Sequence, residues 1–248
     1  MQLQQLCDFC HDFLKVDEFN DYCPNGLQVE ANPQVEHIVC GVTASQALIE
    51  AAIEAGADTL LVHHGYFWKG EAQPITGMKG KRIATLLRHN INLLAYHLPL
   101  DVHPEVGNNV ELARVMGWQL DGNGGEQGLL FEGRVSEPQS LDEFAGSIDS
   151  KLGATPLVIE AGDHAIERIA WCTGAAQGFI EAAAAAGVDA FVSGEISEPT
   201  FHTARELGIH YLAAGHHATE RFGVQALARV IAERFPVTQQ FIDIPNPV

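Results

Sequence analysis

The pattern of hydrophobic and polar positions predicts an alternation of strands and helices over most of the chain. Residues 2–14 place apolar side chains at helical spacing and predict an amphipathic helix. From residue 37 on, short β-branched apolar runs alternate with longer amphipathic segments, which indicates a parallel sheet with right-handed crossovers. The strands expected in this part are residues 37–42, 59–63 and 91–96, and the helices are residues 45–55, 81–89 and 106–116.

A polar, glycine-rich stretch at residues 121–128 is the strongest loop signal in the chain. We take it as a domain boundary and expect two α/β domains, residues 1–121 and 122–248. After this loop we expect a strand near 129–135, a helix near 141–152 and a strand near 156–160. The earlier alternation then resumes, with further strands at 190–193 and 209–214.

The second domain repeats part of the first. Residues 45–58 and 176–189 align at an offset of 131 and share Gln, Ile, Glu, three Ala, Gly and Asp at matching positions. Identical alanines are weak evidence, because any two alanine-rich helices share some of them by chance. The shared Gln, Ile, Glu, Gly and Asp positions are not explained in this way. We therefore expect an α/β fold of two similar halves related by internal duplication, whose strand ends would face each other across a pseudo-twofold axis.

Imidazole and carboxylate groups follow the ends of three predicted strands. One strand ends in two adjacent histidines, and two others are followed by a histidine and, four residues later, a carboxylate. If the last of these pairs opens a helix, its i,i+4 spacing puts both groups on one face. The residues concerned are His63 and His64, His97 and Asp101, and His216 and Glu220.

Such groups at strand ends are what a metal site in an open α/β sheet requires. Two adjacent histidines also occur by chance on protein surfaces. The metal interpretation therefore depends on the other histidines and carboxylates that follow the neighbouring strands. Adjacent strand residues point to opposite faces, which suggests that His63 and His64 serve two different ions. Nitrogen and oxygen ligands suit Zn, Mn, Fe, Co or Ni better than Ca. Three further polar residues could contact the metal ligands or transfer protons: His97, His103 and Glu195. Each is explained equally well as a hydrogen-bonded polar group near a loop. His97 and Glu195 are the catalytic candidates.

Composition narrows the functional classes. The 248 residues carry 14 basic and 32 acidic side chains, a formal charge of −18, which argues against binding to nucleic acid or to anionic membrane surfaces. No apolar run is long enough to span a membrane and no export signal is present, so we expect a cytoplasmic protein. Five cysteines without paired spacing fit free thiols in a reducing compartment, and the C-x-x-C-H motif at residues 7–11 is read as helix packing rather than haem attachment.

Several motifs together resemble the NIF-three-like family, whose bacterial members are often labelled GTP cyclohydrolase type-2 homologues. They are Asn-Gly-Leu-Gln-Val at 25–29, Gly-Val-Thr at 41–43, His-His-Gly at 63–65, His-x-x-x-Asp at 97–101, Ser-Gly-Glu at 193–195 and Gly-His-His-Ala-Thr-Glu at 215–220. The resemblance spans the whole chain. It implies a ring-shaped homohexamer and a dinuclear metal site between the two halves. It also implies the metal ligands His63, His64, Asp101, His216 and Glu220, choosing His216 over His217.

The leading functional hypothesis is a metal-dependent hydrolase of a small nucleotide-like or heterocyclic substrate. An aromatic loop, Tyr66-Phe67-Trp68, follows the histidine pair and offers rings for stacking, although subunit packing explains it equally well. No phosphate-binding loop or dinucleotide motif is present, so the cyclohydrolase label does not establish a reaction. The alternative is a non-enzymatic metal-binding or metal-delivery protein, or a scaffold.

Overall fold

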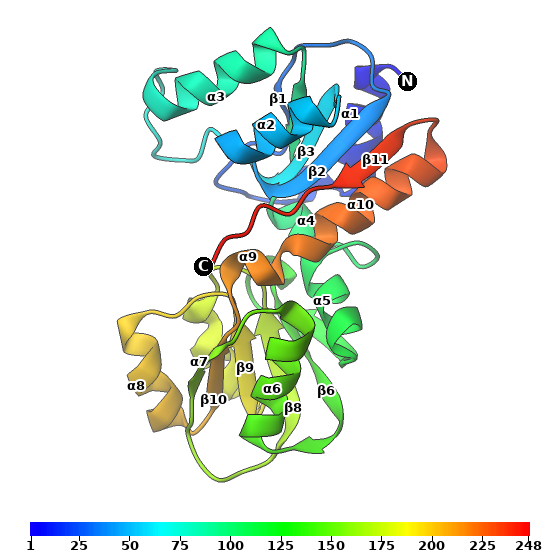
Figure 1. Cartoon of the computed structure of the whole chain (residues 1–248). Helices are drawn as coiled ribbons and strands as arrows, with labels where there is room; N and C mark the ends of the chain where they lie inside the picture. Colours follow the sequence, from blue (N-terminus) through cyan, green and yellow to red (C-terminus); the bar gives the residue numbers. More distant parts are fainter. The chain divides into compact units, whose positions relative to one another are not determined.

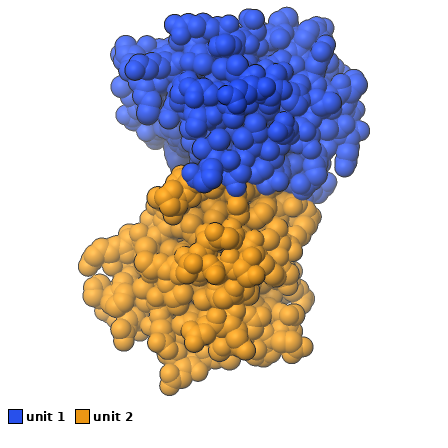
Figure 2. Space-filling view, viewed as in Figure 1, with its two compact units in different colours: residues 1–107, 223–245 blue, residues 108–222, 246–248 orange.

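The structure, a computed structural model, describes residues 1–248 as two compact units. Unit 1 comprises Met1–Gly107 and Gly223–Pro245, and unit 2 comprises Asn108–Phe222 and Asn246–Val248 (Figure 2). The boundary predicted at residue 121 thus falls within unit 2, and a C-terminal segment belongs to unit 1. None of the helices is both long and apolar enough to cross a lipid bilayer.

Unit 1 is built on a five-stranded sheet of order β1-β4-β3-β2-β11, in which β1 is antiparallel to β4 and the other neighbours are parallel (Figure 1). Its strands are β1 (Gly26–Val29), β2 (His37–Thr43), β3 (Thr59–His64), β4 (Asn92–Ala95) and β11 (Thr238–Phe241). Its helices are α1 (Leu3–Phe13), α2 (Gln46–Glu54), α3 (Gly77–Arg88) and α4 (Leu98–Val102), with most of α10 (Arg221–Arg234).

Helices cover both faces of this sheet because its strands are apolar on both faces. Alternate strand residues divide between two cores: Cys40 and Leu61 pack with α1 and α10, whereas Val39 and Leu60 pack with α2 and α3. Ser45 caps α2 by accepting the Leu48 N–H.

Unit 2 contains a six-stranded sheet of order β5-β6-β8-β9-β10-β7. Its strands are β5 (Gln119–Gly124), β6 (Leu130–Gln139), β7 (Leu157–Ile159), β8 (Ile166–Cys172), β9 (Ala190–Ser193) and β10 (His210–Ala213). Its helices are α5 (Asn108–Met116), α6 (Leu141–Leu152), α7 (Ile180–Ala185), α8 (Glu198–Leu207) and α9 (His216–Thr219).

The two sheets share a motif of three parallel strands flanked by an antiparallel one. In unit 1 the order is β1-β4-β3-β2, and in unit 2 it is β7-β10-β9-β8. The parallel β–α–β arrangement predicted from the sequence is therefore confirmed in both units, within a mixed α/β fold.

The loop predicted at residues 121–128 is wrong in its first half. Residues 121–124 belong to β5, which pairs antiparallel with β6 in a hairpin. This edge strand is exposed and rich in glycine and polar residues, so it lacks the apolar alternation by which a strand is recognised.

Candidate functional site

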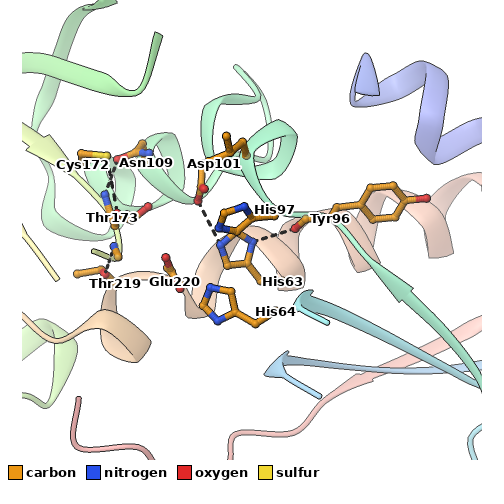
Figure 3. Close-up of polar contacts among 12 residues, drawn as sticks. His63, His64, Tyr96, His97, Asp101, Asn109, Cys172, Thr173, Thr219 and Glu220 are labelled. Carbon is orange, nitrogen blue, oxygen red and sulfur yellow. Dashed lines mark hydrogen bonds and ion pairs between the residues drawn. The ribbon is translucent and has the colours of Figure 1, made fainter. Parts of the chain in front are cut away.

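The carboxyl end of β3, a central strand of unit 1, carries His63. The ring is fully buried, and Nδ1 lies 2.9 Å from the Tyr96 carbonyl oxygen (Figure 3). Because a carbonyl only accepts, Nδ1 donates, and Nε2 is the ring nitrogen that remains for a metal ion; it lies 3.4 Å from Asp101 Oδ1. A backbone carbonyl that fixes the tautomer in this way is typical of metal-ligating histidines.

His64 is the last residue of β3, and its Nδ1 lies 3.3 Å from Thr43 Oγ1 at the end of β2. Its ring centroid is only 4.6 Å from that of His63. The two rings thus lie close together although adjacent strand residues direct their Cβ atoms to opposite faces, and their service to two different ions stays a prediction. Alternation governs the directions of the Cβ atoms, and a long side chain at the very end of a strand can turn back over the edge. The two rings can serve one ion or two.

A third imidazole, His97 at the N-terminus of α4, joins the pair. One ring nitrogen from each of His63, His64 and His97 falls within 4.8 Å of the others. His97 Nδ1 lies 2.9 Å from Asp21 Oδ1, and its backbone N–H donates to Asn25 Oδ1 at 2.6 Å. Asp21 and Asn25 therefore orient this histidine.

Asp21 is a buried hydrogen-bond acceptor for five groups, the most distant of which is the Cys23 thiol at 3.7 Å. It accepts from the backbone N–H groups of Tyr22 and Leu98, the Asn25 amide and the His97 ring, at 2.7–3.0 Å. Burial alone would raise the pKa of Asp21, but the hydrogen bond and charge of His97, with the other donors, hold it well below its usual range. The carboxylate is ionised at neutral pH.

The Cys23 thiol lies in the same group, with its Sγ within 4.8 Å of Asp21 and His97 ligand atoms. Burial, followed by the charges of Asp21 and Asp101, raises the pKa of this thiol far above its usual value. A thiol that stays protonated is a poor nucleophile and a poor metal ligand, so we do not count Cys23 among the proposed ligands.

Two aromatic rings, those of Trp68 and Tyr22, lie beside the histidines. The Trp68 ring centroid lies 5.8 Å from that of His64 and 5.1 Å from that of His97, and Tyr22 lies 5.0 Å from His97 and 5.7 Å from Trp68. Of the three aromatic residues singled out in the sequence, Trp68 is the one placed against the histidines, whereas the Tyr66 hydroxyl donates to the Ala44 carbonyl within the core.

The loop that carries Trp68 is held by Glu71. The Glu71 carboxylate accepts the backbone N–H groups of Phe67 and Trp68, at 2.9 and 3.2 Å, and pairs with Lys79 at 3.5 Å. These bonds keep Phe67 in the left-handed region, with φ of 67°, a conformation that a non-glycine residue adopts only when its surroundings impose it.

In unit 2, His216 is the first residue of the short helix α9 and Glu220 directly follows its last residue. His216 Nε2 lies 3.1 Å from Glu220 Oε2, which confirms the i,i+4 pairing predicted from the spacing. On the opposite side of the ring, Nδ1 lies 2.7 Å from Glu195 Oε1. Burial alone would lower the pKa of His216, but the hydrogen bonds and charges of Glu220 and Glu195 outweigh it and raise the pKa to about 9.

A glycine makes room for this pair. Gly174, with φ of +70°, follows β8, and a Cβ at this position would overlap Glu220 Oε1 and lie 3.1 Å from His216 Nε2. The Gly174 N–H donates to Thr219 Oγ1 at 3.1 Å, and that hydroxyl donates to the His216 carbonyl at 2.9 Å. The end of β8 and α9 are thus tied together beside the carboxylate.

The structure therefore gathers the predicted ligands into one set in each unit. His63, His64 and Asp101 lie together in unit 1 with His97, and His216 and Glu220 lie together in unit 2 with Glu195. His103 has a structural role instead: Nε2 donates to the Phe13 carbonyl at 2.9 Å and Nδ1 accepts two backbone N–H groups. The sequence analysis missed Asp21, because it lies just before Pro24, Asn25 and Gly26, residue types that mark an ordinary turn.

Two mixed α/β units, each bearing clustered imidazole and carboxylate groups where strands end, define the class of protein: a two-unit α/β protein with candidate metal ligands. The chain belongs to the Duf34/NIF3 (NGG1p interacting factor 3) family, whose model matches residues 1–247. A relative from Pseudomonas aeruginosa called "GTP cyclohydrolase 1 type 2 homolog" is 55% identical over 248 residues, 99% of this chain and 98% of its own length.

Solved structures agree with this assignment. A structure titled "Structural genomics, protein ybgI, unknown function" superposes with a TM-score of 0.97 at 48% identity and covers 100% of both chains. That of TTHA1606 from Thermus thermophilus gives a TM-score of 0.91 at 34% identity, again over 100% of both chains. The resemblance inferred from the motifs is therefore confirmed across the chain.

Proposed function

We propose that the chain binds two divalent metal ions through His63, His64, Asp101, His216 and Glu220 and acts as a metal-dependent hydrolase. The observation that carries the proposal is the tautomer of His63. Its Nδ1 is committed to the Tyr96 carbonyl, so that Nε2 and the Asp101 carboxylate, 3.4 Å apart, both present lone pairs. Two lone pairs at that separation repel each other unless a proton or a cation lies between them.

The donor set fits Zn, Mn, Fe, Co or Ni, because imidazole nitrogens and carboxylate oxygens are ligands that these ions share. Unit 1 offers two imidazoles and a carboxylate from the proposed set, and unit 2 offers one of each. Neither set completes two coordination shells by itself, so the proposal of a dinuclear centre rests on the family resemblance. The shared strand motif supports an internal duplication as the origin of the two sets.

The surrounding residues support a hydrolase. Divalent ions bound to these ligands would supply Lewis-acid activation of water and of the substrate. Glu195 holds Nδ1 of His216 and thereby directs Nε2 toward the Glu220 side. Asp21 holds Nδ1 of His97 in the same manner, which places a fixed imidazole beside the histidine pair for proton transfer.

The substrate class proposed is a small nucleotide-like or heterocyclic compound. The Trp68 and Tyr22 rings beside His97 offer aromatic surface against which a flat ring can stack. Tyr22 is half exposed, so part of this surface is open to solvent.

The test is metal titration of chelator-treated protein, followed by a hydrolysis screen against nucleotides, cyclic amides and phosphoesters. We expect two ions per chain and metal-dependent turnover, both reduced in Glu220→Gln. The matched control is Glu198→Gln, which removes an exposed carboxylate from α8. Turnover by Glu220→Gln equal to that of the wild type would remove this site from the chemistry.

The second candidate function is metal binding or delivery without catalysis, which needs the same clustered imidazole and carboxylate groups but no substrate. Metal exchange separates the two functions. A delivery protein releases its ions to a competing chelator within seconds and turns over no substrate in the screen, whereas the proposed hydrolase retains its ions through repeated turnovers.

We also propose that the protein is a homo-oligomer, with a hexamer expected from the family resemblance. Leu157 on the edge strand β7, and Phe201 and Leu207 on the neighbouring α8, are 40–50% exposed, and large apolar side chains at a sheet edge favour association. Light scattering of the purified protein measures the mass directly. A monomeric mass would refute the proposal.

A further inference from the structure

Positive charge is concentrated on one segment of this acidic chain. Residues 69–88 contain five of the 14 basic side chains and a single acidic one, Glu71, and no further carboxylate occurs before Asp101. Most of this segment is α3, which packs beside α2 in unit 1 (Figure 1). A basic helix in a protein of charge −18 is a local feature that the overall balance does not explain.

The basic face of α3 lines an open groove of about 840 Å³. Lys81, Arg82 and Arg88 contribute the charges, and Gln46, the first residue of α2, lines it from that neighbouring helix. A concavity of this size lies within the range of small-molecule sites, roughly 300–1,000 Å³.

The cations of the segment divide into two groups. Lys79 pairs with Glu71, donates to the Ala72 carbonyl and lies 5.5 Å from the centre of the Phe67 ring, so it stabilises the loop. Lys81 and Arg82 form no ion pair and no side-chain hydrogen bond, and neither does Arg88. Three cations therefore face the groove without a carboxylate to neutralise them.

The groove also contains buried polar atoms whose hydrogen-bonding capacity is unused. Arg82 Nε and Gln46 Oε1 are inaccessible to solvent and have no hydrogen-bond partner. The Gln46 amide nitrogen is engaged by Glu50 at 2.9 Å, which leaves Oε1 as an acceptor. Buried polar groups without partners are unfavourable, and a ligand with both an anionic oxygen and a hydrogen-bond donor would satisfy them once the two side chains turn toward the groove.

Apolar surface lies at the same groove. Ile75 and Met78 line it and are 56% and 66% exposed, unusually open for residues of this kind. A ligand that fits has an anionic group for the cations, an N–H or O–H for Gln46, and an apolar or aromatic part for Ile75 and Met78.

We propose that this groove of unit 1 is a binding site for a small organic phosphate, with the phosphate on Lys81, Arg82 and Arg88 and a flat or apolar moiety on Ile75 and Met78. The site is independent of the metal ligands and does not require them. It lies near the edge of the sheet where β2 ends, because Gln46 follows three residues after Thr43, the residue that contacts His64.

A small phosphate explains the features better than a nucleic acid does. A nucleic-acid surface would require basic residues along an extended path, whereas here the remaining surface carries the acidic excess and repels a polyanion. A protein partner would contact a broad, flatter surface and would leave the buried atoms of Arg82 and Gln46 without a partner.

The test is calorimetric titration of chelator-treated, metal-free protein with GTP, pyrophosphate and guanosine. We expect GTP to bind most tightly, pyrophosphate about tenfold more weakly or less, guanosine weakest, and added NaCl to weaken GTP binding. The double variant Lys81→Gln/Arg82→Gln should weaken GTP binding by about tenfold for each cation removed. The control, Lys15→Gln/Arg205→Gln, changes the net charge equally at exposed positions elsewhere and should bind as the wild type does.

Equal GTP binding by the two double variants would overturn the proposal, as would absence of GTP binding by wild-type protein. Tighter binding of single-stranded RNA than of GTP would assign the cations to a different class of ligand and would also overturn it. Because the titration uses metal-free protein, its outcome is separate from that of the metal and turnover measurements above.

Discussion

Replacement of Asp21 by Asn tests whether a buried carboxylate organises the histidine cluster of unit 1. The side chain of Asp21 is only 4% exposed and accepts hydrogen bonds from Tyr22 N and His97 Nδ1 on one oxygen and from Asn25 Nδ2 and Leu98 N on the other. Asparagine has the same shape but replaces one oxygen by an NH₂ group. Whichever way the amide is turned, its NH₂ group then faces at least two other hydrogen-bond donors.

The expected loss in the free energy of unfolding follows from the number of donors that lose their acceptor. A buried donor left without its acceptor costs roughly 1–3 kcal/mol, and two of them in one place, partly relaxed, cost about 2–4 kcal/mol in the free energy of unfolding. Loss of the charge-assisted bond to His97 also frees that ring to rotate. The variant should therefore bind metal more weakly as well as unfold more easily.

Urea denaturation at neutral pH measures the first effect and metal titration the second. Asp12→Asn, an exposed change on α1, is the control and should alter neither. The pKa of Asp21 is lowered on folding, so its contribution is present above its ordinary value of 3.8 and is lost as the pH falls through the folded value. The difference between wild type and variant should thus be constant above about pH 5 and shrink in acid. A difference below about 0.5 kcal/mol at neutral pH would refute the reasoning.

Three further predictions concern the other parts of the site. Gly174→Ala should abolish metal binding by the unit 2 ligands, because its Cβ would overlap Glu220, whereas Gly146→Ala, with open space around its Cβ, should bind normally in the same titration. The raised pKa of His216, about 9, means that zinc must displace a proton at neutral pH; a pH indicator should record release, and affinity should rise about tenfold per pH unit up to that value. Ni²⁺ should quench Trp68 fluorescence, and Trp68→Phe should lose that quenching while still binding the ion; unchanged quenching would contradict the placement of the ring.

The strand ends could be predicted because the physics that forms them is local. β-branched runs mark parallel strands, so the positions of His63 and His216 at the end of such runs were readable from periodicity alone. The pairing of His216 with Glu220 likewise follows from helical geometry over four residues.

Other parts depend on contacts between distant residues, which periodicity does not encode. Asp21 and His97 are 76 positions apart, and nothing in the sequence around Asp21 distinguishes a buried acceptor from an ordinary turn residue. The nearness of the His63 and His64 rings depends on side-chain rotation at a strand end, which alternation of Cβ directions does not determine. The helix α3 was predicted at residues 81–89 and begins four residues earlier, at Gly77, because glycines at 77 and 80 concealed its first turn.

The C-terminal strand of unit 1 has a consequence for how the chain folds during synthesis. β11, at Thr238–Phe241, pairs with β2, at His37–Thr43, across about two hundred intervening residues. All six strands of the unit 2 sheet, by contrast, lie between Gln119 and Ala213. Unit 2 can therefore complete its sheet first during translation. The unit 1 sheet, which carries the histidines of β3, lacks its edge strand β11 until the C-terminal residues have been synthesised.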